Sequence, residues 1–279
     1  MTKPEIFLGS SLEGRWEKFC CRLEECRSTC TGESVRKLRV ALRKLLTQLD
    51  AALQFVDCRS GRNAKARLKR ELKGVGRLRD VQMQRSRLES LKLHGEAVDD
   101  LAGWLKKRER KLMQRIVRSM ADLKLPKLKS QLSKTAAKVS RVLEKSTEGS
   151  EAMLRRLLVR SFKQVERRYQ ALDRRDLDTI HDLRIAFKKY RYLKEAFSSD
   201  KAKRVGVSPF KLYQDKMGEV QDWEVLLKMV HKYCNRQGAG FFRKLTPLRS
   251  RILKERDAAV RKFWAARSDF LQWKGDQES

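Results

Sequence analysis

The sequence predicts an all-α protein. Apolar residues make up 41% of the 279 residues, and they recur every three to four positions in nearly every segment, which is the pattern of amphipathic helices. The chain has only four prolines, and it lacks the runs of alternating valine, isoleucine and threonine that predict strands. These observations favour packed helices over a sheet and over a disordered chain.

The chain also carries a large excess of positive charge. It contains 67 lysine and arginine residues against 35 aspartate and glutamate residues, which gives a net charge of +32. Because so large an excess repels itself in a compact protein, the expected partner is a polyanion such as nucleic acid, an anionic membrane or a phosphate polymer. A membrane-spanning segment is not expected, because no stretch approaches the roughly 20 apolar residues that crossing a bilayer requires.

The cysteines do not form a recognisable disulfide or metal-binding pattern. The six residues are Cys20, Cys21, Cys26, Cys30, Cys58 and Cys234. Cys26 and Cys30 are one helical turn apart, but no histidine lies near them in the sequence, so ordinary thiols are favoured over a metal site. Since no secretory signal is recognised either, we expect reduced thiols, a cytoplasmic location, and neither a metal nor a cofactor.

Periodicity and turn residues predict the helices in order. Gly61 is expected to break the chain, and the fourth helix is expected to end near Pro126. The lysine-rich and serine-rich segment 123–149 is interpreted as a connector, although Leu128, Leu132, Val139 and Leu143 could form an additional helix. The helices expected before this connector are 12–29, 33–56, 63–92 and 96–122.

The segment 180–194 predicts a helix with two contrasting faces. Leu183, Phe187 and Tyr190 fall on an apolar side at 3.6 residues per turn. The other side carries a column of cationic or potentially cationic residues, His181, Arg184, Lys188 and Arg191. Like charges one turn apart destabilise an isolated helix by a few tenths of a kcal/mol per pair. An anion is therefore expected opposite this column.

The second part of the chain repeats the first, at polar as well as apolar positions. At an interval of 145 residues, Arg15, Lys18, Arg22, Arg39 and Arg43 recur as Arg160, Lys163, Arg167, Arg184 and Lys188. At 142 residues, Gly76 and Asp80 recur as Gly218 and Asp222, and at 143 residues Arg108 recurs as Arg251. We therefore expect one domain over 1–279, with half 1 (about 11–122) and half 2 (about 150–272) forming two four-helix bundles related by a pseudo-twofold axis.

These repeated motifs resemble a known family. The segments HDLRIAFKKYR at 181–191 and RKLRVALRK at 36–44, each followed by a helix with a Gly-x-x-x-Asp element, are similar to the conserved histidine α-helical domain, CHAD. The resemblance implies two four-helix bundles with a central basic groove or pore, and binding of inorganic polyphosphate. We expect a non-enzymatic binding module that targets proteins to polyphosphate stores such as granules. By position the resemblance assigns this binding to His181, Arg184, Lys188, Arg191, Arg39 and Arg43.

The first half departs from the family pattern at two positions. Arg36 stands where the first histidine is expected, and Leu46 stands at the counterpart of Arg191. An arginine keeps a hydrogen-bond donor and makes the charge permanent, so anion binding is retained there. Because Leu46 has no charge, the two halves are expected to contribute unequally.

Helical spacing and recurrence add further candidates for binding polyphosphate. Arg15, Lys18, Arg22, Arg160, Lys163 and Arg167 come from the first helix of each half, Lys69, Lys73 and Lys211 precede the two glycines, and Arg108 and Arg251 come from the last helices. A solvated surface position is the alternative for each single residue. Gly76 and Gly218 each cost a helix about 1 kcal/mol relative to alanine, and we expect close helix packing as the reason.

Two other functions fit parts of this pattern. A nucleic-acid-binding protein fits the charge, but most aromatic residues lie on apolar stripes, which provides poorly for base stacking. Nucleic acid is therefore expected only as a non-specific polyanion. A phosphohydrolase would need clustered carboxylates for Mg²⁺, whereas Asp80 and Asp222 are interpreted as buried or half-buried partners that orient nearby cations.

Overall fold

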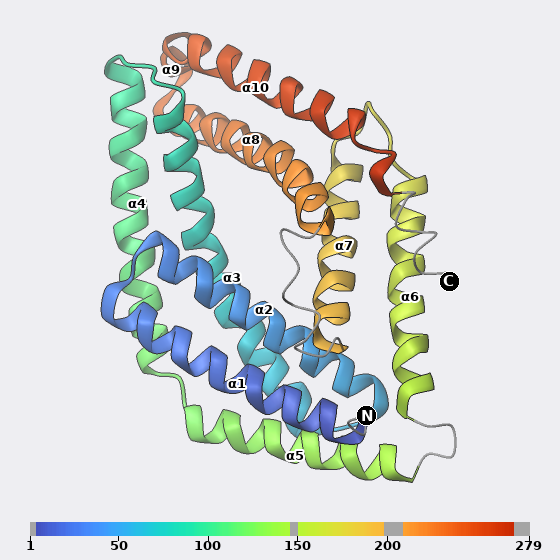
Figure 1. Cartoon of the computed structure of the whole chain (residues 1–279). Helices are drawn as coiled ribbons and strands as arrows, with labels where there is room; N and C mark the ends of the chain where they lie inside the picture. Colours follow the sequence, from blue (N-terminus) through green and yellow to red (C-terminus); the bar gives the residue numbers. More distant parts are fainter. Residues whose placement is uncertain (1–3, 146–149, 198–208, 271–279) are drawn as a thin grey trace. The chain divides into compact units, whose positions relative to one another are not determined.

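The computed structural model describes residues 4–145, 150–197 and 209–270. In this part of the chain all regular structure is helical, which confirms the all-α prediction (Figure 1). The helices are α1 (Pro4–Thr29), α2 (Gly32–Phe55), α3 (Arg59–Ser90), α4 (Glu96–Ala121), α5 (Leu125–Glu144), α6 (Ser150–Gln170), α7 (Asp178–Phe197), α8 (Pro209–Gln237), α9 (Ala239–Lys244) and α10 (Thr246–Ala265). None of these described helices combines the length and apolar character that membrane crossing requires.

The chain forms two compact units. Unit 1 comprises the described residues within 4–79, 111–170 and 186–197, and unit 2 those within 80–110, 171–185 and 209–270. The boundaries fall inside α3, α4 and α7, so each unit takes helices from both halves of the sequence. The division into halves 11–122 and 150–272, their pseudo-twofold relation and the central groove stay predictions.

Two local predictions need correction. Gly61 does not break the chain, because it lies in the first turn of α3. The break comes earlier, where Val56 adopts extended backbone angles at the end of α2. The segment interpreted as a connector is largely α5, a helix of 20 residues that begins with a proline in its first turn, where the missing N–H costs nothing.

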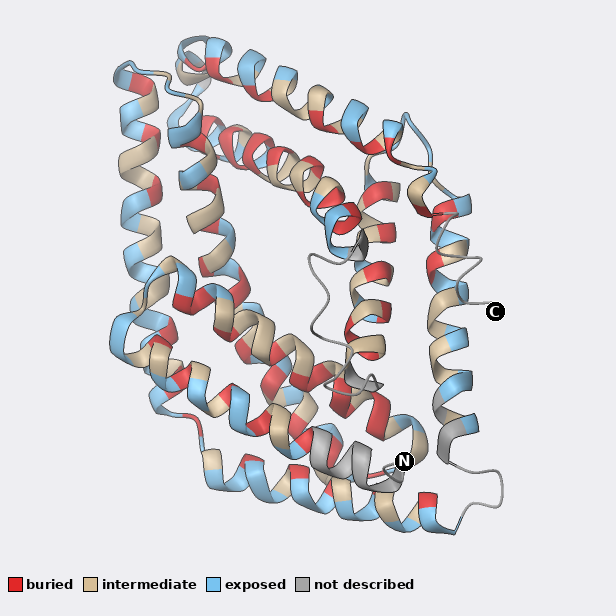
Figure 2. Ribbon diagram, viewed as in Figure 1, coloured by how far each residue is buried: buried red, intermediate tan, exposed pale blue. Residues whose placement is uncertain are grey.

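The apolar residues of α5 explain why it is helical. Leu128, Leu132, Val139 and Leu143 are all buried, as expected for the additional helix that the sequence allowed. Figure 2 shows buried positions along α5 among exposed ones. These four residues share one face of α5, which packs against α1 and α2. The lysines of the opposite face, including Lys127 and Lys129, are exposed.

The core of unit 1 lies between α1, α2 and α5, and apolar residues of α3 and α4 join it. Trp16, Phe19 and Leu23 from α1 are buried at helical spacing, and Leu38 and Leu45 from α2 join the same cluster. The side chain of Thr31 caps α2 by accepting a hydrogen bond of 3.1 Å from the Ser34 amide, which satisfies one amide that the first helical turn leaves without a partner. This cap fixes the start of the helix that carries Arg39 and Arg43.

The core of unit 2 is built on α8, which packs against α9 and α10. The ring of Tyr213 lies 5.8 Å from that of Phe263 and 6.4 Å from that of Phe270. Farther along α8, the ring of Tyr233 lies 5.4 Å from that of Trp104 on α4. Such aromatic pairs stabilise beyond the apolar area they bury, and they hold α8 and its glycine in place.

Candidate anion-binding sites

The helix α7 has the two faces that its sequence predicts. Leu183, Phe187 and Tyr190 are buried on the apolar side, and burial raises the pKa of the Tyr190 hydroxyl to about 12. The column of His181, Arg184, Lys188 and Arg191 is half-buried throughout. Partial burial matters because a cation that has lost part of its water binds an anion more strongly than an exposed one does.

A glycine packs against an arginine in each unit. In unit 1, a Cβ atom placed on Gly76 would lie 3.7 Å from Nε and 3.8 Å from Nη2 of Arg39. In unit 2, a Cβ atom on Gly218 would lie 3.5 Å from Nη2 and 3.6 Å from Nε of Arg184. Both glycines are buried. The residues that recur in the sequence therefore make the same contact twice.

This contact does not by itself account for the two helical glycines. Helix packing was the expected reason for Gly76 and Gly218, but a guanidinium group is the nearest neighbour of both. A Cβ atom at these distances would make ordinary contact with the guanidinium, so alanine would fit at either position. The arginine lies close to each glycine, but its placement does not require the glycine.

Arg184 also lines a pocket of about 830 Å³ in unit 2. The pocket has mixed charge: its charged residues are Arg87, Arg184, Lys216, Asp215, Glu219, Asp222 and Asp269. A volume of this size falls within the range of small-molecule sites. Its cations come from α3, α7 and α8, so three helices direct positive groups to one cavity.

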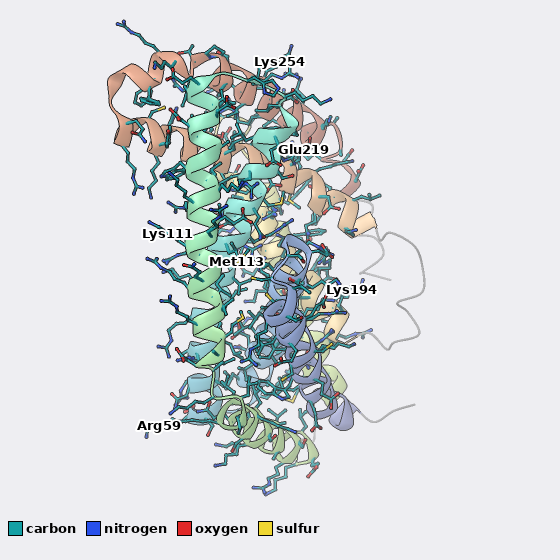
Figure 3. The ribbon with its side chains drawn as sticks, turned by 90° about the vertical axis from the view of Figure 1, so that its left-hand side faces the viewer. Arg59, Lys111, Met113, Lys194, Glu219 and Lys254 are labelled. Atoms are coloured by element: carbon teal, nitrogen blue, oxygen red, sulfur yellow. The ribbon has the colours of Figure 1, made fainter. Side chains whose placement is uncertain are left out.

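Most carboxylates of this pocket are engaged by cations. Asp222 lies 3.6 Å from Arg87, whose guanidinium also lies 4.7 Å from the ring centre of Trp223. Asp269 lies 3.4 Å from Lys216. Glu219, labelled in Figure 3, lies 3.7 Å from Lys262. Asp222 thus orients a neighbouring cation as predicted, whereas its counterpart Asp80 is exposed rather than buried.

Unit 1 contains a cluster of three cations around one carboxylate. Lys44 Nζ on α2 lies 2.6 Å from Oε2 of Glu195, and Arg191 Nε on α7 lies 3.2 Å from its Oε1. Arg15 on α1 donates a hydrogen bond of 3.5 Å to the backbone oxygen of Glu195. Burial lowers the pKa of the Arg15 guanidinium, and the charge of Glu195 opposes that shift. We call Arg15, Lys44, Arg191 and Glu195 the Glu195 cluster.

Sequence reasoning had singled out Arg15 and Arg191 but missed Lys44. A signal was present, because Lys44 recurs as Lys189 at the same interval of 145 residues that relates Arg39 to Arg184. In the structure Lys189 lines a pocket of about 490 Å³ together with Lys65 and Arg160. The recurring pair Lys44 and Lys189 thus lies beside a carboxylate in one case and beside a cavity in the other.

The sequence model of the CHAD domain matches residues 11–231. The chain belongs to the CHAD domain family.

Solved structures show the same fold. The CHAD domain from the plant Ricinus communis superposes with a TM-score of 0.75 at 15% identity, over 95% of this chain and 91% of that one. PptA from Streptomyces chartreusis superposes with a TM-score of 0.68 at 15% identity, over 94% of this chain and 98% of its own. No curated protein matches the sequence. At this identity the likenesses establish the CHAD fold and leave the ligand to be argued from the residues.

The remaining candidates of this CHAD domain lie on its surface or beside local partners. Arg36, in place of the family histidine, pairs with Glu33 at 2.6 Å one turn earlier. Arg22 pairs with Glu25, and Arg251 with Glu255 at 3.0 Å, while the Arg108 guanidinium lies 5.2 Å from the ring centre of Trp104. The exposed candidates are Lys18, Lys69, Lys73, Arg160, Lys163, Arg167 and Lys211.

Half of the candidates are half-buried. They are Arg15, Arg22, Arg39, Arg43, Arg108, His181, Arg184, Lys188 and Arg191. Lys111 and Lys254, which also recur, are exposed on α4 and α10 (Figure 3). Recurrence alone thus does not separate half-buried cations from solvated ones, and the assignment of all these residues to a binding site stays a prediction.

Proposed function

We propose that this CHAD domain binds inorganic polyphosphate through the arginine and lysine side chains that recur along its helices, and that it does not catalyse a reaction on the polymer. Polyphosphate is a flexible chain of phosphate groups, each with about one negative charge and oxygens that accept hydrogen bonds. Arginine offers a planar fork to two such oxygens, and lysine offers a point charge with rotatable donors. Several cations at helical spacing suit a ligand that repeats the same charged group.

Support comes from the duplicated contact of arginine with glycine. Arg39 against Gly76 and Arg184 against Gly218 place two guanidinium groups in equivalent, half-buried settings. A small anion would need only one such position. A polymer of identical groups can use both, and a chain with a net charge of +32 attracts it over a long range.

Binding without catalysis is favoured by the state of the carboxylates. Metal-assisted cleavage of a phosphate chain requires carboxylates that can hold Mg²⁺. In the unit 2 pocket, Asp222, Glu219 and Asp269 are already engaged by cations. Incubation with polyphosphate and Mg²⁺ is expected to release no phosphate beyond the protein-free control, and release proportional to protein concentration would contradict this part of the proposal.

A competition experiment tests the ligand. Labelled long-chain polyphosphate is bound first, then challenged with unlabelled polyphosphate, duplex DNA, RNA and orthophosphate at several salt concentrations. Because binding releases counterions from the polyanion, added salt weakens binding of every polyanion, by about 10³ to 10⁵ between 50 and 200 mM salt when six to ten phosphates are contacted. Salt dependence alone therefore does not identify the ligand.

The preference at one fixed salt concentration decides between the ligands. We expect unlabelled polyphosphate to displace the label at a much lower phosphate concentration than DNA, RNA or orthophosphate requires. If DNA or RNA displaces the label as effectively as polyphosphate, the domain is a general nucleic-acid binder and the proposal fails.

A polyphosphate-binding module could attach proteins to polyphosphate stores in the cytoplasm. A fluorescent fusion of this chain is then expected to collect on polyphosphate granules and to disperse in cells that lack the polymer. Unchanged localisation in such cells would argue against this role.

A further inference from the structure

The Glu195 cluster holds an internal anion among cations from three helices. Arg15 comes from α1, Lys44 from α2 and Arg191 from α7. Two of these cations approach the carboxylate itself, at 2.6 and 3.2 Å, and the third contacts the backbone of the same residue. Arg251 and Glu255, by comparison, pair within a single helix. This cluster instead gathers cations that are distant in the sequence.

We infer that Arg15, Lys44 and Arg191 form a phosphate-binding site that the Glu195 carboxylate occupies when no polymer is bound. Resting on the function proposed above, this inference identifies which ligand group enters the site: one internal phosphate of polyphosphate displaces the carboxylate. Both anions carry about one negative charge and accept hydrogen bonds from lysine and arginine. Lys44 is then a phosphate-binding residue, and the Glu195 carboxylate competes with phosphate for the same cations.

The exposure of the cluster suits such an exchange. The side chains of Lys44, Arg191 and Glu195 are 28%, 18% and 32% exposed. They are open enough for a phosphate group to reach them, yet shielded enough for charge to act more strongly than it does in bulk water. A partly exposed ion pair adds little to folding stability, so its loss on ligand binding costs the protein little.

Position also separates this cluster from the other paired carboxylates. Glu195 lies in the last turn of α7, one turn after Arg191. The cluster takes Arg15 and Lys44 from half 1 and Arg191 from half 2. The equivalent set, 145 residues away, would be Arg160, Lys189 and Leu46, so it lacks the third cation.

Neutralising the competitor tests the inference. Glu195→Gln keeps the size of the side chain and removes its charge, so polyphosphate should bind about two- to fivefold more tightly at fixed salt, as expected for loss of one partly exposed like charge. Glu24→Gln is the matched control, because Glu24 pairs with Arg27 on α1, outside the cluster and outside the candidate residues. It makes the same change in net charge and should leave the affinity within about twofold of the wild type.

A second variant assigns the gain to the cluster. Adding Lys44→Met to Glu195→Gln should abolish the gain in affinity, whereas adding Lys134→Met, at an exposed position of α5, should retain it. Unchanged or weaker binding by Glu195→Gln, relative to Glu24→Gln, would overturn the inference and leave the carboxylate as a structural partner. Absence of polyphosphate binding by the wild type would instead overturn the proposed function.

Discussion

Reversing the charge of Arg184 together with Lys188 is expected to weaken polyphosphate binding by about ten- to a hundredfold, the effect of losing hydrogen bonds between charged groups. Arg184 is held against Gly218 and lines the pocket of unit 2. Glutamate at this position removes the donors and adds a charge that repels phosphate. The dissociation constant of Arg184→Glu/Lys188→Glu, measured by fluorescence anisotropy at fixed salt, checks this.

The control keeps the change in charge and moves it away from the motif. Lys127→Glu/Lys129→Glu alters net charge by the same amount on the exposed face of α5, and it should weaken binding severalfold less. Thermal denaturation establishes that both double variants remain folded. Equal losses in the two would mean that polyphosphate is attracted by diffuse charge rather than bound at the recurring residues.

Replacing Gly61 and Gly76 by alanine is expected to change stability in opposite directions. A Cβ atom on Gly61 would lie 2.8 Å from Oγ1 of Thr135 and 2.9 Å from Cδ2 of Leu53. Because these atoms belong to packed side chains, Gly61→Ala should destabilise the domain by about 1–3 kcal/mol. At Gly76 the new methyl group meets only the Arg39 guanidinium at ordinary contact distance, so Gly76→Ala should stabilise by about 0.5–1 kcal/mol.

Urea denaturation of the two variants measures both effects. Gly103 on α4 serves as the reference, because a Cβ atom there would meet no heavy atom within 4 Å, and Gly103→Ala should resemble Gly76→Ala. Stabilisation by Gly61→Ala would show that α3 and α5 are not packed closely at that point.

Much of the secondary structure follows from local patterns. The expected helices 33–56 and 96–122 agree with α2 and α4 to within one residue at each end, because both carry a clear apolar stripe between residues that favour helix ends. Gly61 was misjudged for a physical reason. In a sequence, a glycine indicates conformational freedom. At this position it instead leaves space for the side chain of Thr135, and that contact between α3 and α5 can be seen only in the folded structure.

The sequence predicted which residues are candidates for binding, but it did not predict which contacts they make. Recurrence pointed to Arg39 with Gly76 and to Arg184 with Gly218 as equivalent pairs, yet no local pattern states that the guanidinium would rest on the glycine. Glu195 was missed because its partners Arg15 and Lys44 lie 180 and 151 residues away in the sequence. Ion pairs between residues so far apart depend on how the helices pack. Neither the periodicity of apolar residues nor helix propensity predicts that packing.

The boundaries of the two units could not be predicted from the sequence for a related reason. A repeat in the sequence follows the order of helices along the chain, whereas the units follow contacts, and α3, α4 and α7 each contribute residues to both. Long helices can therefore carry recurring cations into either unit. This is why the column of α7 divides, with Arg184 in unit 2 and Arg191 in unit 1.

A crystal structure of the domain with bound polyphosphate measures the central claim most directly. The account predicts phosphate oxygens at about 2.7–3.2 Å from guanidinium nitrogens of both Arg39 and Arg184, as charge-assisted hydrogen bonds require. Polymer bound instead along the exposed lysines of α5, with no phosphate oxygen in reach of either arginine, would contradict it.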